Sequence, residues 1–187
     1  MCNKHYAWGD ESVRVQGPGS SQYLIGVCLC DKSESDIRAA FKDAHLIQGP
    51  KVHWRDMNVS ERKRSIKLIN SMHFTNLVVS AGPITGAMRP ERARRKCLEK
   101  LIPALEHDYG ITHLRMEARS SKQDMEEMAF MQHLHERGFL DTLRYKLLPG
   151  SQDARLWIPD QILGAIGGID AGITMPIENV KRDSIEL

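Results

Sequence analysis

Short apolar segments alternate with longer segments of helical periodicity along most of the chain. Residues 4–10 alternate between apolar and polar in the manner of a strand, and residues 22–30, after the turn-forming segment 17–21, are almost continuously apolar. Together the two segments predict an antiparallel hairpin. Ser33 and Asp36 then have the spacing of a helix capping box, which predicts a short helix after the hairpin.

The remaining pattern predicts strands that alternate with helices. We interpret residues 51–57 as a short strand and the loop that leaves it, followed by a helix capped by Ser60. Further strands are expected at 74–82, 111–119 and 142–148, and helices at about 89–107, from Ser121 to Gly138, and at 156–169. This order predicts an α/β fold, a mixed sheet with helices on both faces. We expect one domain over 1–172 and a loosely held tail over 173–187, where periodicity is lost.

Three acidic residues stand out because of their positions in this pattern. Asp10 ends the first strand, on the side of Tyr6 and Trp8, although carboxylates are poor strand formers. Asp160 follows Pro159 at the start of an otherwise apolar helix, where the helix dipole also favours a negative charge. Glu117 lies on a later strand and is informative only in combination with the other two. Each acid alone also has an ordinary structural explanation.

Taken together, these acids predict metal chemistry. Carboxylates from an early strand, a later strand and a late helix can converge at one end of a sheet, and hard cations prefer such oxygen ligands. Two ions about 3.5–4 Å apart activate water and stabilise the leaving oxygen during phosphodiester cleavage. We therefore expect Asp10, Glu117 and Asp160 to hold Mg²⁺ or Mn²⁺.

Other candidate site residues are weaker. In the central segment, Asp56 is a candidate fourth acid and His53 a candidate site residue, although a histidine beside Trp54 is more often a packed core residue. Arg119, near Glu117, is a candidate to hold the scissile phosphate. Basic side chains opposite the apolar stripe of the helix at 89–107 are candidates for phosphate contacts, or an ordinary solvated face: Arg92, Arg95 and Lys96.

Composition narrows the class of protein without naming a substrate. With 41% hydrophobic and 27% charged residues the chain is typical of globular proteins, and its net charge of +2 gives no general argument for nucleic acid. The four cysteines include no CxxC pair. The polar N-terminus predicts no signal peptide and no apolar run is long enough for a membrane span, so we expect a cytoplasmic protein.

Four short motifs resemble the domain-of-unknown-function 3800 family. They are Asp10-Glu11-Ser12, the segment 52–56, Glu117 and the segment 156–160, and the resemblance covers roughly residues 5–170. Val13 stands where that family's opening motif has Gly. The resemblance implies a ribonuclease H-like fold, with metal held by Asp10, Glu117 and Asp160 and with Glu11 as a helper.

The leading hypothesis is a Mg²⁺- or Mn²⁺-dependent nuclease that cleaves phosphodiesters in DNA or RNA. Two alternatives stay open: a non-catalytic module that binds nucleic acid or protein, and a hydrolase of small phosphate esters or nucleotides. The chain has no phosphate-binding loop, GxSxG or HExxH motif, which disfavours nucleotide-driven motors, α/β-hydrolases and zincin proteases. The sequence does not distinguish DNA from RNA, and its apolar last helix leaves room for a homodimer.

Overall fold

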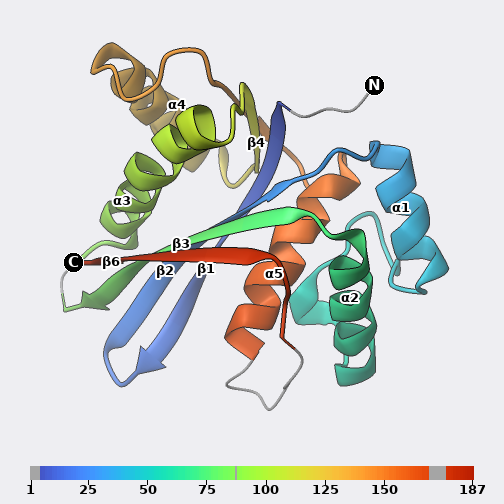
Figure 1. Ribbon diagram of the computed structural model, residues 1–187. Helices are drawn as coiled ribbons and strands as arrows, with labels where there is room; N and C mark the ends of the chain where they lie inside the picture. The colour runs from blue at the N-terminus through green and yellow to red at the C-terminus, as the bar shows by residue number, and fades with distance from the viewer. Residues whose placement is uncertain (1–4, 87, 169–175) are drawn as a thin grey trace.

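The computed structural model describes residues 5–86, 88–168 and 176–187, which form a six-stranded mixed sheet with helices on both faces (Figure 1). The strands lie in the order β5-β4-β1-β2-β3-β6. They are β1 (Tyr6–Gly17), β2 (Ser20–Leu29), β3 (Thr75–Thr85), β4 (His113–Glu117), β5 (Arg144–Leu148) and β6 (Val180–Glu186). The main helices are α1 (Glu34–Asp43), α2 (Val59–Met72), α3 (Pro90–Pro103), α4 (Ser121–Glu136) and α5 (Trp157–Gly168). The predicted fold class is confirmed.

The centre of the sheet combines an antiparallel hairpin with parallel strands. β1 pairs antiparallel with β2, and β2 with β3, while β1, β4 and β5 run parallel. β1 is longer than predicted, because residues beyond Asp10 continue to pair with β2 as far as the Gly17–Ser20 pair. The prediction that the first strand ends at Asp10 is therefore wrong.

Each face of the sheet has its own hydrophobic core, as the alternation of side chains along a strand requires. On one face Trp8, Cys28 and Val78 pack against residues of α1, α2 and α5. On the other, Ala7 and Val27 pack against residues of α3, α4 and the π-helical turn η2 (Ala104–Asp108) that follows Pro103. Neighbouring residues on β1 therefore point to opposite faces of the sheet and have different neighbours.

Local predictions around α2 and α4 need correction. Residues 51–57 form a 3₁₀ turn, η1 (Trp54–Asp56), and no strand. The segment is held by the Trp54 ring, which is buried against α5, and not by backbone pairing with a strand. The capping residues are also shifted: Asn58 caps α2 in place of Ser60, and Ser120 caps α4 in place of Ser121. The caps at Asn58 and Ser120 both form complete capping boxes. The predicted cap of α1 at Ser33 is confirmed.

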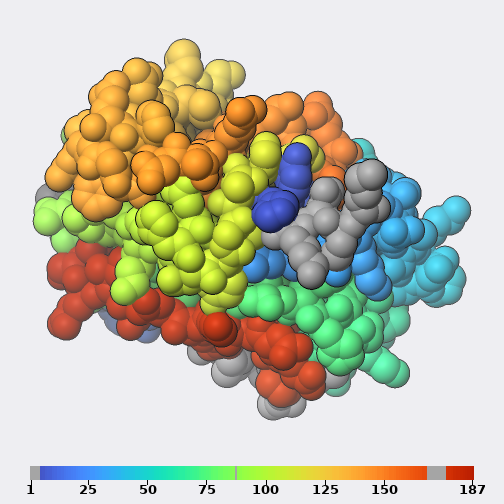
Figure 2. Space-filling view, turned by 45° about the horizontal axis from the view of Figure 1, so that its top comes forward, coloured from blue at the N-terminus to red at the C-terminus, as the bar shows by residue number. Residues whose placement is uncertain are grey.

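The prediction of a loosely held tail is wrong for the residues described. β6 pairs in parallel with β3 from Asn76–Val180 to Gly82–Glu186. The sequence is mostly polar because this edge strand is exposed, and its backbone pairing needs no hydrophobic periodicity. Lys100 and Asp183 add an ion pair at 3.1 Å. Figure 2 shows these C-terminal residues, in red, as a continuous band on the surface. Residues 173–175 lie outside the described ranges.

Of the described helices, none combines the length and the apolar character that a membrane crossing needs.

Candidate functional site

Asp10 lies where β1 and β4 separate. The parallel pairing of these strands ends at Gly9 and Met116, so the next residue on each strand is Asp10 and Glu117. Tyr6 and Trp8 face the α5 side of the sheet, and alternation directs Asp10 to the same side. Leu114 and Met116 face the opposite core, which places Glu117 on the α5 side as well. The strand register thus brings two of the predicted acids together.

Asp160 comes from the first turn of α5 and is held by hydrogen bonds. The backbone N–H of Trp54 donates to Asp160 Oδ2 at 2.8 Å, and the Gln161 side-chain amide donates to the same oxygen at 3.0 Å. The helix approaches η1 closely because Gly164 has no side chain, and a Cβ there would overlap the Trp54 ring. Close packing of α5 therefore fixes the position of the third acid.

Asp10 is near enough to Glu117 and to Asp160 for both charges to act on it. Burial, together with the charges of Glu117 and Asp160, raises the pKa of Asp10 to about 8, against the opposing effects of Lys51 and of the Glu11 N–H. That N–H donates to Asp10 Oδ1 at 2.7 Å. Burial also raises the pKa of Asp160, while the Trp54 N–H, Lys51 and His53 oppose the shift. The predicted acids therefore lie together, with Asp10 under the charges of the other two.

Lys51 is a member of this group that the sequence reasoning missed. Its ammonium forms an ion pair with Glu117 Oε1, and the Lys51 and Glu117 side chains are only 9% and 17% exposed. Glu117 Oε2 is buried without a hydrogen-bond partner. The only signal in the sequence is that Lys51 directly precedes the central motif. Within the described residues no three carboxylate, imidazole or thiolate groups are arranged as a ready-made metal site.

His53 and Asp56 have different surroundings. His53 is near enough to Asp160 to influence the pKa of that carboxyl group. Together with Lys51, it lines an open pocket of about 420 Å³. Asp56 also lines this pocket, but its side chain is 67% exposed and pairs with Arg55 at 3.7 Å. The structure therefore brings His53 toward the acids and leaves Asp56 in solvent.

Glu11 and Arg119 lie on the α3 side of the sheet, away from the three acids. Glu11 accepts a hydrogen bond from Arg94 Nε at 2.6 Å and lies 3.3 Å from Arg119 Nε. Both arginines also pair with the fully buried Glu127. Neighbouring residues on a strand point to opposite faces, so Glu11 cannot face the same side as Asp10. The structure does not bring the predicted helper Glu11, or Arg119, to the acidic group.

Comparison with known proteins supports the fold. No family model matches this chain, and no curated protein matches it. Among solved structures, it is similar to the structure of the PCNA:RNase HII complex from Archaeoglobus fulgidus, with a TM-score of 0.56 and 11% identity over 89% of this chain and 73% of that chain. The chain has a ribonuclease H-like fold. The resemblance to the domain-of-unknown-function 3800 family stays a prediction, since no family model bears on it.

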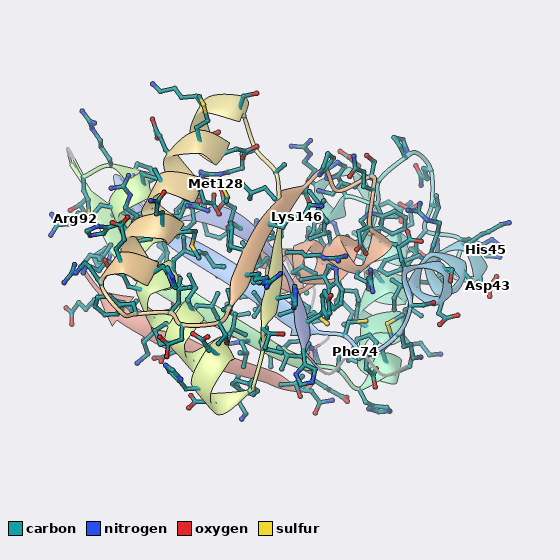
Figure 3. All side chains as sticks on the ribbon, turned by 90° about the horizontal axis from the view of Figure 1, so that it is seen from above. Asp43, His45, Phe74, Arg92, Met128 and Lys146 are labelled. Atoms are coloured by element: carbon teal, nitrogen blue, oxygen red, sulfur yellow. The ribbon has the colours of Figure 1, made fainter. Side chains whose placement is uncertain are left out.

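The predicted phosphate-binding residues lie on α3 of this ribonuclease H-like fold, on the sheet face opposite α5. Arg92, Arg95 and Lys96 line an open groove of about 810 Å³ that also includes Lys122 of α4. Arg95 stacks over Phe130 at 5.3 Å, and Lys96 pairs with Glu99 at 2.6 Å. In Figure 3 Arg92 lies at the opposite end of the molecule from α1, where Asp43 and His45 are labelled. Glu91, Glu99 and Glu126 also line the groove, so its basic side chains are partly balanced, and it is separate from the three acids of the α5 side.

Proposed function

We propose that this protein is a divalent-metal-dependent nuclease that hydrolyses phosphodiester bonds of DNA or RNA. The observation that carries the proposal is the convergence of Asp10, Glu117 and Asp160. Burial of Asp10 and the charges of the other two acids raise its pKa to about 8. Such a group is costly to keep ionised unless a cation compensates it. A bound cation would compensate the negative charge, and the ionised acids would therefore bind it favourably.

The donor set fits Mg²⁺ or Mn²⁺. Three carboxylates supply hard oxygen ligands, and Glu117 Oε2 is buried without a hydrogen-bond partner. When bound, the ion would polarise the phosphate of the substrate and make a water molecule more acidic. The chain itself orients the ligands: the Glu11 N–H holds Asp10, and the Trp54 N–H holds Asp160. An open pocket lined by Lys51 and His53 lies next to this group of acids.

Nucleic acid is the substrate class that the surroundings favour. The similar structure contains an RNase HII, a nuclease by name, in a complex with PCNA, and shares the ribonuclease H-like fold. The α3 groove adds Arg92, Arg95 and Lys96, which can bind phosphates at a distance from the reacting bond. The thiols of Cys28, Cys30 and Cys97 are free and buried, which fits the reducing cytoplasm that we propose as the compartment.

A non-catalytic binding module is the second candidate, and the ion pair between Lys51 and Glu117 favours it. An ammonium that already compensates part of the acidic charge allows the group to persist without any metal. Such a module would bind nucleic acid through the α3 groove and retain that affinity after the acids are neutralised.

The deciding experiment is a cleavage assay on single- and double-stranded DNA, RNA and DNA–RNA hybrids, with Mg²⁺, Mn²⁺ or EDTA. We expect metal-dependent cleavage that falls at least about 100-fold in Asp10→Asn and Asp160→Asn, because each removes a ligand charge. Asp56→Asn is the matched control, since Asp56 is a solvent-exposed acid, and it should cut like the native protein.

Three results would redirect the proposal. Equal cleavage by the folded Asp→Asn variants would make the acids structural. Binding without cleavage, weakened steeply by salt, would select the binding module. Hydrolysis of mononucleotides or small phosphate esters alone would select the remaining alternative, a hydrolase of small phosphate esters or nucleotides.

A further inference from the structure

Lys51 brings a fixed positive charge to the three acids. Its ammonium pairs with Glu117 Oε1, and its charge also acts on the carboxyl groups of Asp10 and Asp160. The side chain is 9% exposed, so it does not reach the acids as a mobile surface lysine would. One positive charge is therefore already shared among the three acids.

The fold provides a slot for this lysine. Gly150 packs directly against it: a Cβ at position 150 would lie 2.5 Å from Lys51 Cδ, 2.8 Å from Lys51 Cε and 2.9 Å from Glu117 Oε1. The Gly150 carbonyl accepts a hydrogen bond from the buried Trp157 Nε1 at 2.7 Å, which ties the slot to α5. The position of the ammonium is thus set by the core rather than by solvent.

Charge balance limits what else the acids can hold. Once a bound ion has displaced the Asp10 proton, the three carboxylates are balanced by one ammonium and one divalent ion. Two divalent ions together with the ammonium would exceed the carboxylate charge by two, in a buried site where unbalanced charge is costly. Lys51 also engages Glu117 Oε1, which leaves only Oε2 of that carboxylate free of a partner.

We infer that Lys51 is a built-in substitute for one of the two cations expected at this site, so that the protein takes a single divalent ion. The inference rests on the proposed function, because it concerns the same three carboxylates. It assigns Lys51 a role in setting metal stoichiometry, and Gly150 the role of keeping its slot open.

The test is a titration of metal-free protein with Mn²⁺ alone, following free Mn²⁺ by electron paramagnetic resonance. The native protein, Lys51→Met and the control Lys63→Met are compared, Lys63 being an exposed lysine of α2. We expect one ion in the native and control proteins. In Lys51→Met we expect a second ion, or binding of the first that is at least about tenfold tighter, because a nearby positive charge is removed. Lys51→Gln, which keeps a polar group in the slot, serves where Lys51→Met does not fold.

Each outcome has a distinct meaning. Two ions in the native protein, or identical stoichiometry and affinity in the native and charge-removed proteins, overturn the role of Lys51 and leave the metal site standing. A folded native protein that binds no ion contradicts the proposed function itself, and the inference falls with it.

Discussion

At the scale of single residues, strand alternation decides which acids can act together. Asp10 and Glu11 are adjacent in the sequence, yet one joins Glu117 and Asp160 while the other pairs with Arg94 on the opposite face. The three acids could be selected from the sequence only as a set, because Glu117 alone is unremarkable and Asp10 does not end its strand as predicted. Lys51 could not, since its importance arises from contacts with Glu117 and Gly150 that lie far away along the chain.

The raised pKa of Asp10 predicts a pH-dependent stability. In the folded protein this carboxyl keeps its proton up to about pH 8, whereas the unfolded chain releases it near the usual value of 3.8. The folded state therefore binds more protons between these values, and the free energy of unfolding falls as the pH rises through the window. We expect Asp10→Asn to remove this cost and to be more stable than the native protein at pH 9, by about 2–5 kcal/mol.

Urea denaturation at pH 5 and pH 9, in metal-free buffer, measures this difference. Asp56→Asn should follow the native protein at both pH values, because that carboxylate is in solvent. Parallel pH dependence of Asp10→Asn and the native protein would show that Asp10 is ionised without cost.

At the scale of elements, local signals predicted what local interactions determine. The hairpin, the cap at Ser33 and the buried last helix follow from alternation, capping chemistry and apolar content. The turn η1 was mistaken for a strand because β-forming residues also suit a single buried aromatic anchor. The contact between Trp54 and Gly164 of α5 lies far away along the chain and leaves no signal in the segment itself.

Gly164→Ala tests this contact. In an ordinary helix the change stabilises by up to about 1 kcal/mol, but here the added methyl overlaps the Trp54 ring. We expect a net loss of about 1–3 kcal/mol from overpacking, with a shift in tryptophan fluorescence. The displaced Trp54 N–H would also release Asp160, so Mn²⁺ affinity should change. Gly49→Ala, where no atom lies near the added methyl, is the control, and equal stability of the two variants would contradict the packing argument.

At the scale of the whole molecule, the sheet positions the site and β6 completes the sheet. The mixed α/β architecture could be predicted from element order alone, because a hairpin followed by alternating strands and helices has few ways to pack. β6 could not, since an exposed edge strand is held by backbone hydrogen bonds that leave no hydrophobic pattern. Its pairing covers β3, whose Leu77, Val79 and Ala81 contribute to the core on the α3 face.

Removing residues 176–187 should therefore destabilise the sheet, because it removes β6. Without β6, β3 becomes a long apolar edge strand, the kind of edge that pairs with other chains. We expect a lower unfolding temperature and concentration-dependent self-association, measured by thermal denaturation and size-exclusion chromatography. Arg182→Ala keeps the backbone pairing while changing one exposed side chain, and should remain close to the native protein. A truncated protein that stayed monomeric and equally stable would mean that the last strand is dispensable to the sheet. The acids on β1 and β4 would then depend on the hairpin and α5 alone.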